Sequence, residues 1–180
     1  MITEKTFIEG LLVIKPKVFE DARGYFFESF NEHLLAEAGI KDKFVQDNQS
    51  LSQKNVLRGL HFQSPPYTQG KLVRVIKGAV LDVVVDIRKK SPTYGKHFAV
   101  ELNEQNKIMF WVPGGFAHGF TTLQDNTIFH YKCTRYYNKE SEGSILYNDP
   151  DLGIDWGISS PLLSEKDKTG ALFKDFVSPF

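Results

Sequence analysis

The sequence of 180 residues lacks several features that mark large classes of proteins. It contains one cysteine, Cys133, so no disulfide can form within the chain, and no group of Cys and His residues has the spacing of a zinc site. It has no excess of either charge, because 22 Lys and Arg residues balance 22 Asp and Glu residues. Without a basic surface to attract phosphates, a nucleic-acid partner is not expected.

Long apolar runs and targeting signals are missing as well. No apolar stretch is long enough to cross a bilayer, and the N-terminal segment MITEKTFIEG lacks the basic and then apolar pattern of a signal peptide. No repeat, low-complexity segment or linker divides the chain. We therefore expect one soluble domain over residues 1–180, located in the cytoplasm and with no membrane partner.

What the sequence has in abundance is strand-forming residues, including 15 Phe and 7 Tyr. Short apolar runs bounded by turn residues occupy residues 11–14, 25–30, 71–76, 80–87, 97–102, 107–112, 120–123 and 127–134. The turn sequences at residues 77–79, 103–106 and 124–126 predict three hairpins. Hairpins at such regular spacing are typical of an antiparallel sandwich or barrel, so the predicted fold class is all-β.

One helix is predicted, near the N-terminus. The segment S-F-N-E at residues 29–32 fits a capping box with Ser29 as the N-cap, and Leu34, Leu35 and Ala38 have helical apolar spacing. Gly39 is expected to end the helix. The tail from residue 149 onward is rich in Pro and Asp, and we expect it to wrap the sheets as loops and short helical turns.

A possible metal motif lies at residues 113–118, P-G-G-F-A-H. Its form, P-x-G-x-x-H, resembles the second motif of the cupin barrels, many of which bind a metal through this His, an earlier H-x-H pair and a Glu. The earlier segment here, L-H-F-Q at residues 60–63, has no second His, and no Asp or Glu lies between His61 and Gly78. Lys71 lies in that stretch instead, and a cation repels a metal ion and supplies no ligand. A metal site is therefore not expected.

The polar residues that remain are suited to moving protons. His61 can take a proton near neutral pH, Lys71 or a second His, His118, can stabilise an oxyanion, and Tyr131 can return a proton. Strand alternation places Asp82, Val84 and Asp86 on one side of residues 80–87 and Leu81, Val83 and Val85 on the other. Periodicity does not decide which side is the interior, so a polar interior and a solvent-facing polar side both remain open.

Several segments, in order along the chain, make the sequence recognisable. They are R-G-Y-F-F-E at residues 23–28, Q-D-N at 46–48, L-R-G-L-H-F-Q at 57–63, Q-G-K-L-V at 69–73, P-G-G-F-A-H-G-F at 113–120, Y-K-C-T at 131–134 and N-D-P-D-L-G-I at 148–154. Together they resemble the dTDP-4-dehydrorhamnose 3,5-epimerase family from about residue 11 to residue 168. The resemblance implies a cupin-like jelly-roll β-barrel with a short N-terminal helix and a C-terminal tail of loops and short helices, active as a homodimer.

The resemblance also implies roles for individual residues. His61 would be the catalytic base, Asp167 the residue that orients it, Tyr131 the proton donor and Lys71 the cation beside the sugar ketone. A separate interpretation of S-x-x-D at residues 164–167 is a helix N-terminal cap, which needs no catalysis. Positions that contact the substrate in the family fall on Arg23, Glu28, Gln46, Asn48, Arg58, His118, Tyr137, Glu142 and Lys166, with Tyr137 stacking on thymine.

The implied reaction is epimerisation at C3 and C5 of dTDP-4-dehydro-6-deoxy-D-glucose to dTDP-4-dehydro-L-rhamnose, in dTDP-L-rhamnose biosynthesis. Loss of a proton beside the C4 ketone forms an enolate, which needs no nicotinamide, and the chain has no G-x-G-x-x-G to bind one. We expect a nucleotide-sugar substrate and no cofactor. Two alternatives stay open: an enzyme that epimerises one carbon or isomerises the ketone, and a cupin that binds a sugar or nucleotide without catalysis. A base, a cation and a Tyr together disfavour the second alternative.

Overall fold

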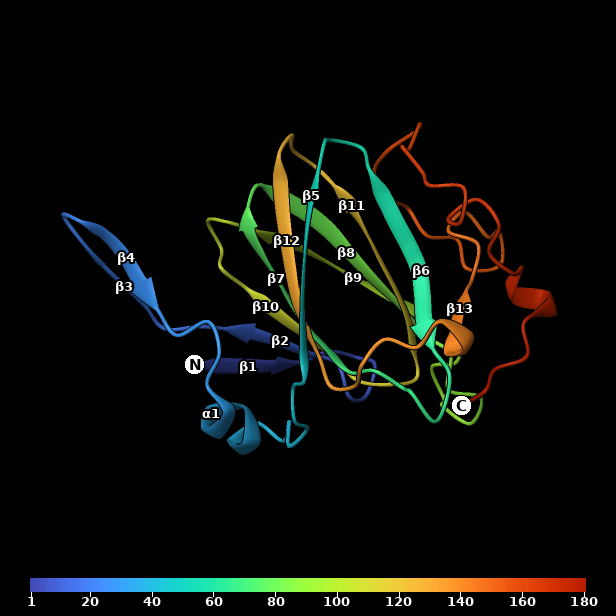
Figure 1. The fold of residues 1–180 in the computed structure, drawn as a ribbon, viewed down its shortest axis with the longest axis horizontal. Helices are drawn as coiled ribbons and strands as arrows, with labels where there is room; N and C mark the ends of the chain where they lie inside the picture. Colours follow the sequence, from blue (N-terminus) through green and yellow to red (C-terminus); the bar gives the residue numbers. More distant parts are fainter.

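The computed structural model describes all of residues 1–180, and it confirms the predicted all-β class. Two main sheets face each other, and a separate two-stranded ribbon projects from one end of the molecule (Figure 1). The first sheet has the order β1 (Ile2–Lys5), β2 (Leu12–Lys15), β10 (Met109–Val112), β7 (Lys71–Lys77), β12 (Thr127–Cys133) and β5 (Gln46–Ser52). The second has the order β13 (Glu142–Ser144), β6 (Leu57–Gln63), β11 (Phe116–Thr122), β8 (Ala79–Asp86) and β9 (His97–Asn103). No strand pair joins the sheets, so the predicted barrel remains open as two layers.

The three predicted hairpins are wrong in their pairing, although the strands on either side of each turn are present. The turn at residues 77–79 leads from β7 to β8, the turn at 103–106 from β9 to β10, and the turn at 124–126 from β11 to β12. In each case the two strands belong to different sheets. Each turn therefore carries the chain across the sandwich. Apolar side chains of consecutive strands, such as Val75 and Val80, are buried against each other in one core cluster instead of lying side by side.

The structure also decides which side of β8 is the interior. Val84 belongs to the central core cluster together with Val73 of β7, so the side that carries Asp82 and Val84 faces the first sheet. The other side, with Val83 and Val85, packs against the C-terminal tail and is not exposed to solvent. The polar side of β8 therefore faces the space between the sheets, where Asp82 is fully buried.

The predicted helix is α1 (Glu32–Glu37), and it begins later than expected. Its N-cap is Asn31, whose side-chain oxygen accepts a hydrogen bond from the backbone N–H of Leu34 at 3.1 Å. Ser29 was the predicted cap, but Asn caps a helix equally well and lies closer to the apolar positions. Gly39 follows the helix as predicted, with a φ of 93° that favours glycine. None of the helices is long and apolar enough to span a bilayer.

The C-terminal tail forms turns and loops, as predicted, and contains one 3-10 turn at Phe173–Asp175. A second 3-10 turn, at Lys139–Ser141, precedes the tail. The tail covers the outer face of the second sheet, where its residues Leu152 and Trp156 are buried against Leu60 of β6. The indole N–H of Trp156 donates to the carbonyl of Tyr147 at 2.8 Å, which holds this part of the tail in place. The tail thereby becomes part of the core and can position side chains beside β6.

The projecting ribbon consists of β3 (Val18–Asp21) and β4 (Gly24–Phe27). It stands away from the two sheets in Figure 1, and its large apolar side chains are poorly covered. Phe19, Tyr25 and Phe26 are 53%, 56% and 67% exposed. This much exposed aromatic surface on one ribbon is unusual for a folded chain.

Candidate active site

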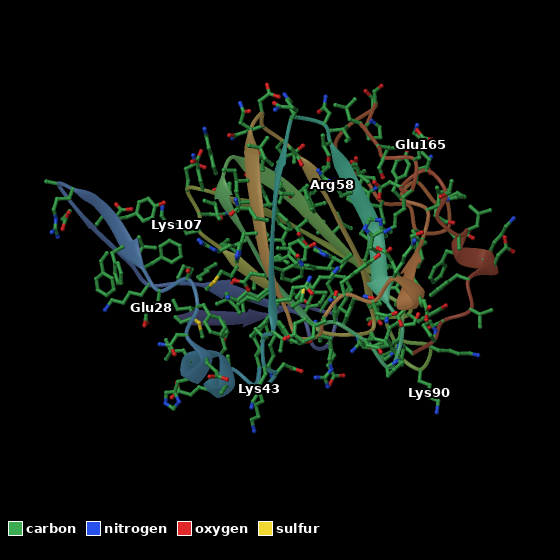
Figure 2. The ribbon with its side chains drawn as sticks, in the orientation of Figure 1. Glu28, Lys43, Arg58, Lys90, Lys107 and Glu165 are labelled. Carbon is green, nitrogen blue, oxygen red and sulfur yellow. The ribbon has the colours of Figure 1, made fainter.

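A pocket of about 300 Å³ opens between the two sheets. Strands β5, β7 and β12 form one wall, β6 and β11 form the opposite wall, and the C-terminal tail closes one side. Figure 2 labels Arg58, which belongs to the wall formed by β6. Many of the residues predicted from the sequence line this one pocket: Asn48, Arg58, His61, Lys71, His118, Tyr131, Lys166 and Asp167.

His61 lies on β6 and contacts Asp167 of the C-terminal tail. Its Nε2 lies 2.8 Å from Oδ1 of Asp167, although the ring is turned away from ideal hydrogen-bond geometry. The side chain of His61 is 26% exposed, whereas that of Asp167 is 5% exposed. A proton on Nε2 next to the carboxylate leaves the lone pair on Nδ1, so His61 can serve as a neutral base.

Asp167 is held by more than the imidazole. Its Oδ1 accepts the backbone N–H of Gly59 at 3.1 Å, and its Oδ2 accepts the hydroxyl of Ser164 at 2.5 Å. Burial by itself would raise the pKa of Asp167, but the contacts with His61, Ser164 and Gly59 outweigh burial and lower the pKa to about 2. Residues 164–167 form a turn with no helix after it, so the capping interpretation lacks its helix.

Glycines bring β6 and β11 close together beside the histidines. His61 and His118 are directly opposite each other in the register of these strands, and the register shifts just after His118. A Cβ on Gly59 would lie 2.5 Å from Cα of Gly119, and a Cβ on Gly119 would lie 2.7 Å from the carbonyl oxygen of Arg58. Gly59 also has a φ of 134°. Only glycine fits at both positions. Because Gly59 and Gly119 have no side chains, β6 and β11 can approach closely, and this determines how far apart His61 and His118 lie.

Lys71 is the cation on the opposite wall. It begins β7, its ammonium lies 5.8 Å from the centre of the Tyr131 ring, and it makes no ion pair within 4.0 Å. Burial lowers the pKa of Lys71, while Cys133, Asp82 and Glu142 act in the opposite direction. A desolvated ammonium that forms no ion pair with a protein carboxylate can bind a negatively charged oxygen of a ligand.

Tyr131 comes from β12, in the same sheet as Lys71. It pairs with Asn48 of β5 on one side and with Val73 of β7 on the other. Burial raises the pKa of Tyr131, and Cys133 adds to this, although Arg58 and Asn48 act against it. The phenol therefore keeps its proton at neutral pH, as a proton donor must. Cys133 itself is fully buried, as expected of a small core residue.

His118 is buried in a second His–Asp pair. Its Nε2 lies 2.9 Å from each carboxylate oxygen of Asp82 on β8, and the side chains are 7% and 0% exposed. Asp82 was not among the residues assigned to the site from the sequence, although its place on the polar side of β8 was the available signal. The pair fixes the orientation of the His118 ring at the floor of the pocket.

Known proteins resemble this chain over almost its whole length. Residues 5–175 match the family described as dTDP-4-dehydrorhamnose 3,5-epimerase. This chain belongs to that family. The protein of that name from Salmonella typhimurium is 55% identical over 174 residues, covering 96% of this chain and 95% of the relative. Its counterpart from Shigella flexneri is 53% identical over 172 residues, covering 95% of each.

A solved structure supports the same assignment. The dTDP-6-deoxy-D-glucose-3,5-epimerase from Legionella pneumophila, in complex with dTDP-4-keto-L-rhamnose, superposes with a TM-score of 0.94 at 51% identity, covering 98% of this chain and 94% of that one. The chain is thus an isomerase of the epimerase class.

In this epimerase the predicted rim residues are linked to one another. The hydroxyl of Tyr137 donates to Oε2 of Glu142 at 3.0 Å, and the ammonium of Lys166 forms an ion pair with Oε1 of the same carboxylate. Burial would raise the pKa of Glu142, but Lys166 and Tyr137 lower it overall. Gln46 accepts the backbone N–H of Tyr137 at 3.0 Å. These residues form a polar edge beside the pocket, and Lys166 is the member that lines the pocket itself.

Two predicted residues lie away from the pocket of their own chain. Arg23 sits at the tip of the β3–β4 ribbon, where its guanidinium pairs with Asp21 at 2.5 Å. Glu28 lies at the base of the ribbon, and Figure 2 shows it far from Arg58 of the pocket wall. Within one chain these residues and the pocket do not meet.

The pocket also contains residues that were not assigned to the site from the sequence: Gln49, Ser50, Gly119, Phe120, Phe129 and Ser164. Phe120 and Phe129 stack at 4.2 Å between ring centres and supply an apolar patch on the wall. For Ser50 and Phe129 the available signal was strand alternation, because Ser50 is two residues from Asn48 and Phe129 two from Tyr131. Nowhere do three His, Cys, Asp or Glu side chains gather in a way that could hold a metal ion.

Proposed function

We propose that this chain inverts C3 and C5 of dTDP-4-dehydro-6-deoxy-D-glucose to give dTDP-4-dehydro-L-rhamnose, a step of dTDP-L-rhamnose biosynthesis. One observation carries the proposal: His61 and Tyr131 come from opposite sheets and line the same pocket. Inversion of a carbon requires that a proton leave from one side and return from the other, and two facing walls provide a base and an acid for that purpose. The names of the relatives, dTDP-4-dehydrorhamnose 3,5-epimerase, describe the same reaction.

The chemistry follows from the ketone at C4. A hydrogen on C3 or C5 is acidic because its removal gives an enolate. His61, oriented by Asp167 at 2.8 Å, takes this proton and becomes positively charged. Lys71 stabilises the negative charge that develops on the ketone oxygen, and His118 adds a fixed hydrogen-bonding group on the other wall. Tyr131 then gives its proton to the opposite side of the carbon, and exchange with solvent restores both groups.

The polar residues around the pocket suit the nucleotide part. Arg58 reaches the hydroxyl of Ser52 at 3.2 Å and presents a planar set of donors at the pocket wall, which fits a diphosphate. Tyr137 is 53% exposed beside Glu142, so its ring is free to stack on thymine. Gln46, Asn48, Glu142 and Lys166 complete the substrate contacts in this proposal.

We further propose that the enzyme is a homodimer in which the β3–β4 ribbon of each protomer reaches the pocket of the other. The exposed Phe19, Tyr25 and Phe26 would be covered in this way, and Arg23 and Glu28 would come to a substrate that they do not approach in their own chain. Mixing Arg23→Ala protein with His61→Ala protein tests this, because one of the two sites in a mixed dimer then keeps both groups. Recovery of activity is expected, and its absence under conditions of subunit exchange would contradict the shared site.

The reaction itself is tested in heavy water. The enzyme is incubated with dTDP-4-dehydro-6-deoxy-D-glucose in deuterium oxide, and deuterium in the sugar is counted by mass spectrometry. Two deuterium atoms, at C3 and C5, are expected. One atom would identify a single-site epimerase, transfer of the ketone would identify an isomerase of that kind, and no exchange would favour a binding protein.

We propose that neither a metal nor an organic cofactor takes part. Both pocket histidines are engaged by carboxylates, and the cation Lys71 occupies the remaining wall. Turnover is expected to survive prolonged chelation, with no metal bound in stoichiometric amount. Loss of turnover on chelation and its return on addition of zinc or iron would refute this part of the proposal.

We infer, finally, that the chain is one domain with a jelly-roll strand order. The inner strands run β10-β7-β12-β5 in one sheet and β6-β11-β8-β9 in the other, and from β5 to β12 consecutive strands alternate between the sheets except for β8 and β9, which pair with each other. This alternation supports a double-sheet jelly roll, the arrangement of the cupins.

A further inference from the structure

One hydroxyl on the pocket wall has no explanation within the protein. The Oγ of Ser50, on β5, is shielded from solvent and makes no hydrogen bond, yet Ser50 lines the pocket. A buried hydroxyl without a partner costs stability, and such groups in folded proteins call for a reason. The reason here is not packing, because alanine would fill the same position without a polar atom.

The neighbours of Ser50 on the same side of β5 are both engaged. The side-chain amide of Asn48 donates to Sγ of Cys133 at 3.6 Å, and the hydroxyl of Ser52 accepts from Arg58 at 3.2 Å. Ser50 is paired across the sheet with Phe129, whose ring offers it no hydrogen bond. Rotation about the single side-chain torsion of Ser50 would therefore break no existing contact, and the hydroxyl is free to turn toward a ligand.

The order of groups along this wall matches the order of groups along the substrate. Asn48 pairs with Tyr131, the proposed acid, and Ser52 holds Arg58, the proposed diphosphate contact, with Ser50 between them. Successive residues on one side of a strand are about 7 Å apart. In the substrate, C2 with its hydroxyl lies between the reacting C3 and C1, which carries the diphosphate.

We propose that the Ser50 hydroxyl binds the C2 hydroxyl of the sugar and makes the enzyme discriminate against 2-deoxy substrates. This inference rests on the proposed function and assigns a specificity role within that site. A site built around a hydroxyl disfavours a substrate that lacks it, because its own buried group is then left without a partner. The two hydroxyls satisfy each other, and the unpaired state seen in the structure ends when substrate binds.

The test compares wild-type enzyme with Ser50→Ala on the parent nucleotide sugar and on its 2-deoxy analogue. Wild type is expected to lose about tenfold in kcat/KM on the analogue. Ser50→Ala is expected to lose about tenfold on the parent and almost nothing on the analogue, so that the preference disappears. Equal losses on both substrates, or no loss on the parent, would overturn the proposal.

A binding measurement separates this inference from the reaction itself. In His61→Ala protein, which cannot abstract a proton, the Kd of each nucleotide sugar is measured with Ser50 present and with Ser50→Ala added. The same loss of preference is expected in Kd. If wild type showed no deuterium exchange but Ser50→Ala still removed the preference in Kd for the parent sugar, the proposed reaction would be wrong and the Ser50 contact would stand. If Ser50→Ala left that preference unchanged, the contact alone would be wrong.

Thr121→Val is the matched control. The Oγ1 of Thr121 is also buried without a hydrogen bond, but Thr121 does not line the pocket. Its replacement is expected to leave the preference for the parent sugar unchanged. Ser50→Ala should unfold at the same temperature as wild type or higher, since it removes an unsatisfied group. A lower melting temperature of Ser50→Ala would indicate a structural role. In that case Ser50→Cys, which is close in size to the wild type, is used for the same kinetic comparison. If Ser50→Cys kept the preference for the parent sugar over the 2-deoxy analogue, this would count against the contact.

Discussion

The two His–Asp pairs of this epimerase lie opposite each other on β6 and β11, yet they are built differently. Asp82 comes from β8, the next strand of the same sheet, and its pair with His118 is almost closed to solvent, at 7% and 0% exposure. Asp167 comes from the C-terminal tail, and its partner His61 stays 26% exposed. The His118–Asp82 pair is thus a fixed, buried group, whereas the His61–Asp167 pair has a histidine that substrate can reach. Access, more than residue type, distinguishes the proposed base from its neighbour.

The largest expected effect separates the two histidines. His61→Ala should reduce turnover by about 10⁴-fold and abolish deuterium exchange, because the proposed base is lost. His118→Ala should reduce turnover far less, by about 10-fold, and leave exchange measurable, because it removes one stabilising group. Exchange is followed by mass spectrometry, with melting temperatures as the control for folding. Equal losses in the two variants would erase the distinction between the pairs.

Tyr131→Phe sharpens the comparison from the opposite wall. It keeps the ring and removes the proton donor, so turnover should fall by about 10³-fold. Some exchange should remain, since His61 can return the proton that it removed. Exchange and inversion are measured in the same heavy-water sample. Wild-type turnover in this variant would require a different acid.

The next effect concerns the two carboxylates. Asp167→Asn should lower kcat by about 100-fold with little change in KM, because the orientation of the base matters most when the proton moves. Asp82→Asn should cost about 10-fold, since His118 would keep a hydrogen-bonding partner in the amide. Steady-state kinetics on both variants provide the measurement. The reverse order would make His118 the more important histidine.

The smallest expected effect is on stability in acid. The pKa of Asp167 is lowered from 3.8 to about 2 in the fold, so the unfolded chain takes up this proton first as the pH falls. The stabilisation is fully present above pH 5 and is lost as the pH drops toward 2, by about 1 kcal/mol at pH 3. Urea unfolding at pH 7 and pH 3 should show a loss that is larger in wild type than in Asp167→Asn by this amount, because other carboxylates with a lowered pKa, such as Glu142, contribute equally in both proteins. Parallel losses would mean that this carboxylate is not coupled to folding.

The sequence predicted the parts of the molecule that depend on local pattern. The alternation in residues 80–87 and 127–134 identified strands that the structure contains as β8 and β12. The motif segments placed His61, Lys71 and Tyr131 together, and all of them line one pocket. Asn31 in place of Ser29 as the helix cap is a small error of the same local kind, because either residue can accept the hydrogen bond.

Apart from the contact between His61 and Asp167, which the family resemblance implied, the sequence did not predict which residues would be joined across the site. Asp82 was visible as a polar residue on β8, but its contact with His118 depends on the register between β8 and β11. Ser50 lies in a strand, β5, that was not predicted, and its unpaired hydroxyl is visible only once every neighbour is placed. Arg23 was assigned to the site, and its distance from the pocket depends on how the ribbon leaves the sheets.

By itself, then, the sequence determined most of the strands and the residue types that can move protons, because these follow from neighbours along the chain, but β5 and β6 were not among the predicted strands. Only the tertiary structure decided that each short turn crosses between sheets and that the polar side of β8 faces inward. It also brought Asp167 of the tail to His61 of β6, a contact that only the family resemblance had implied. A short turn can join two strands edge to edge or face to face, and the choice depends on which apolar surfaces are buried together. That burial involves residues distant in sequence, so no local pattern records it.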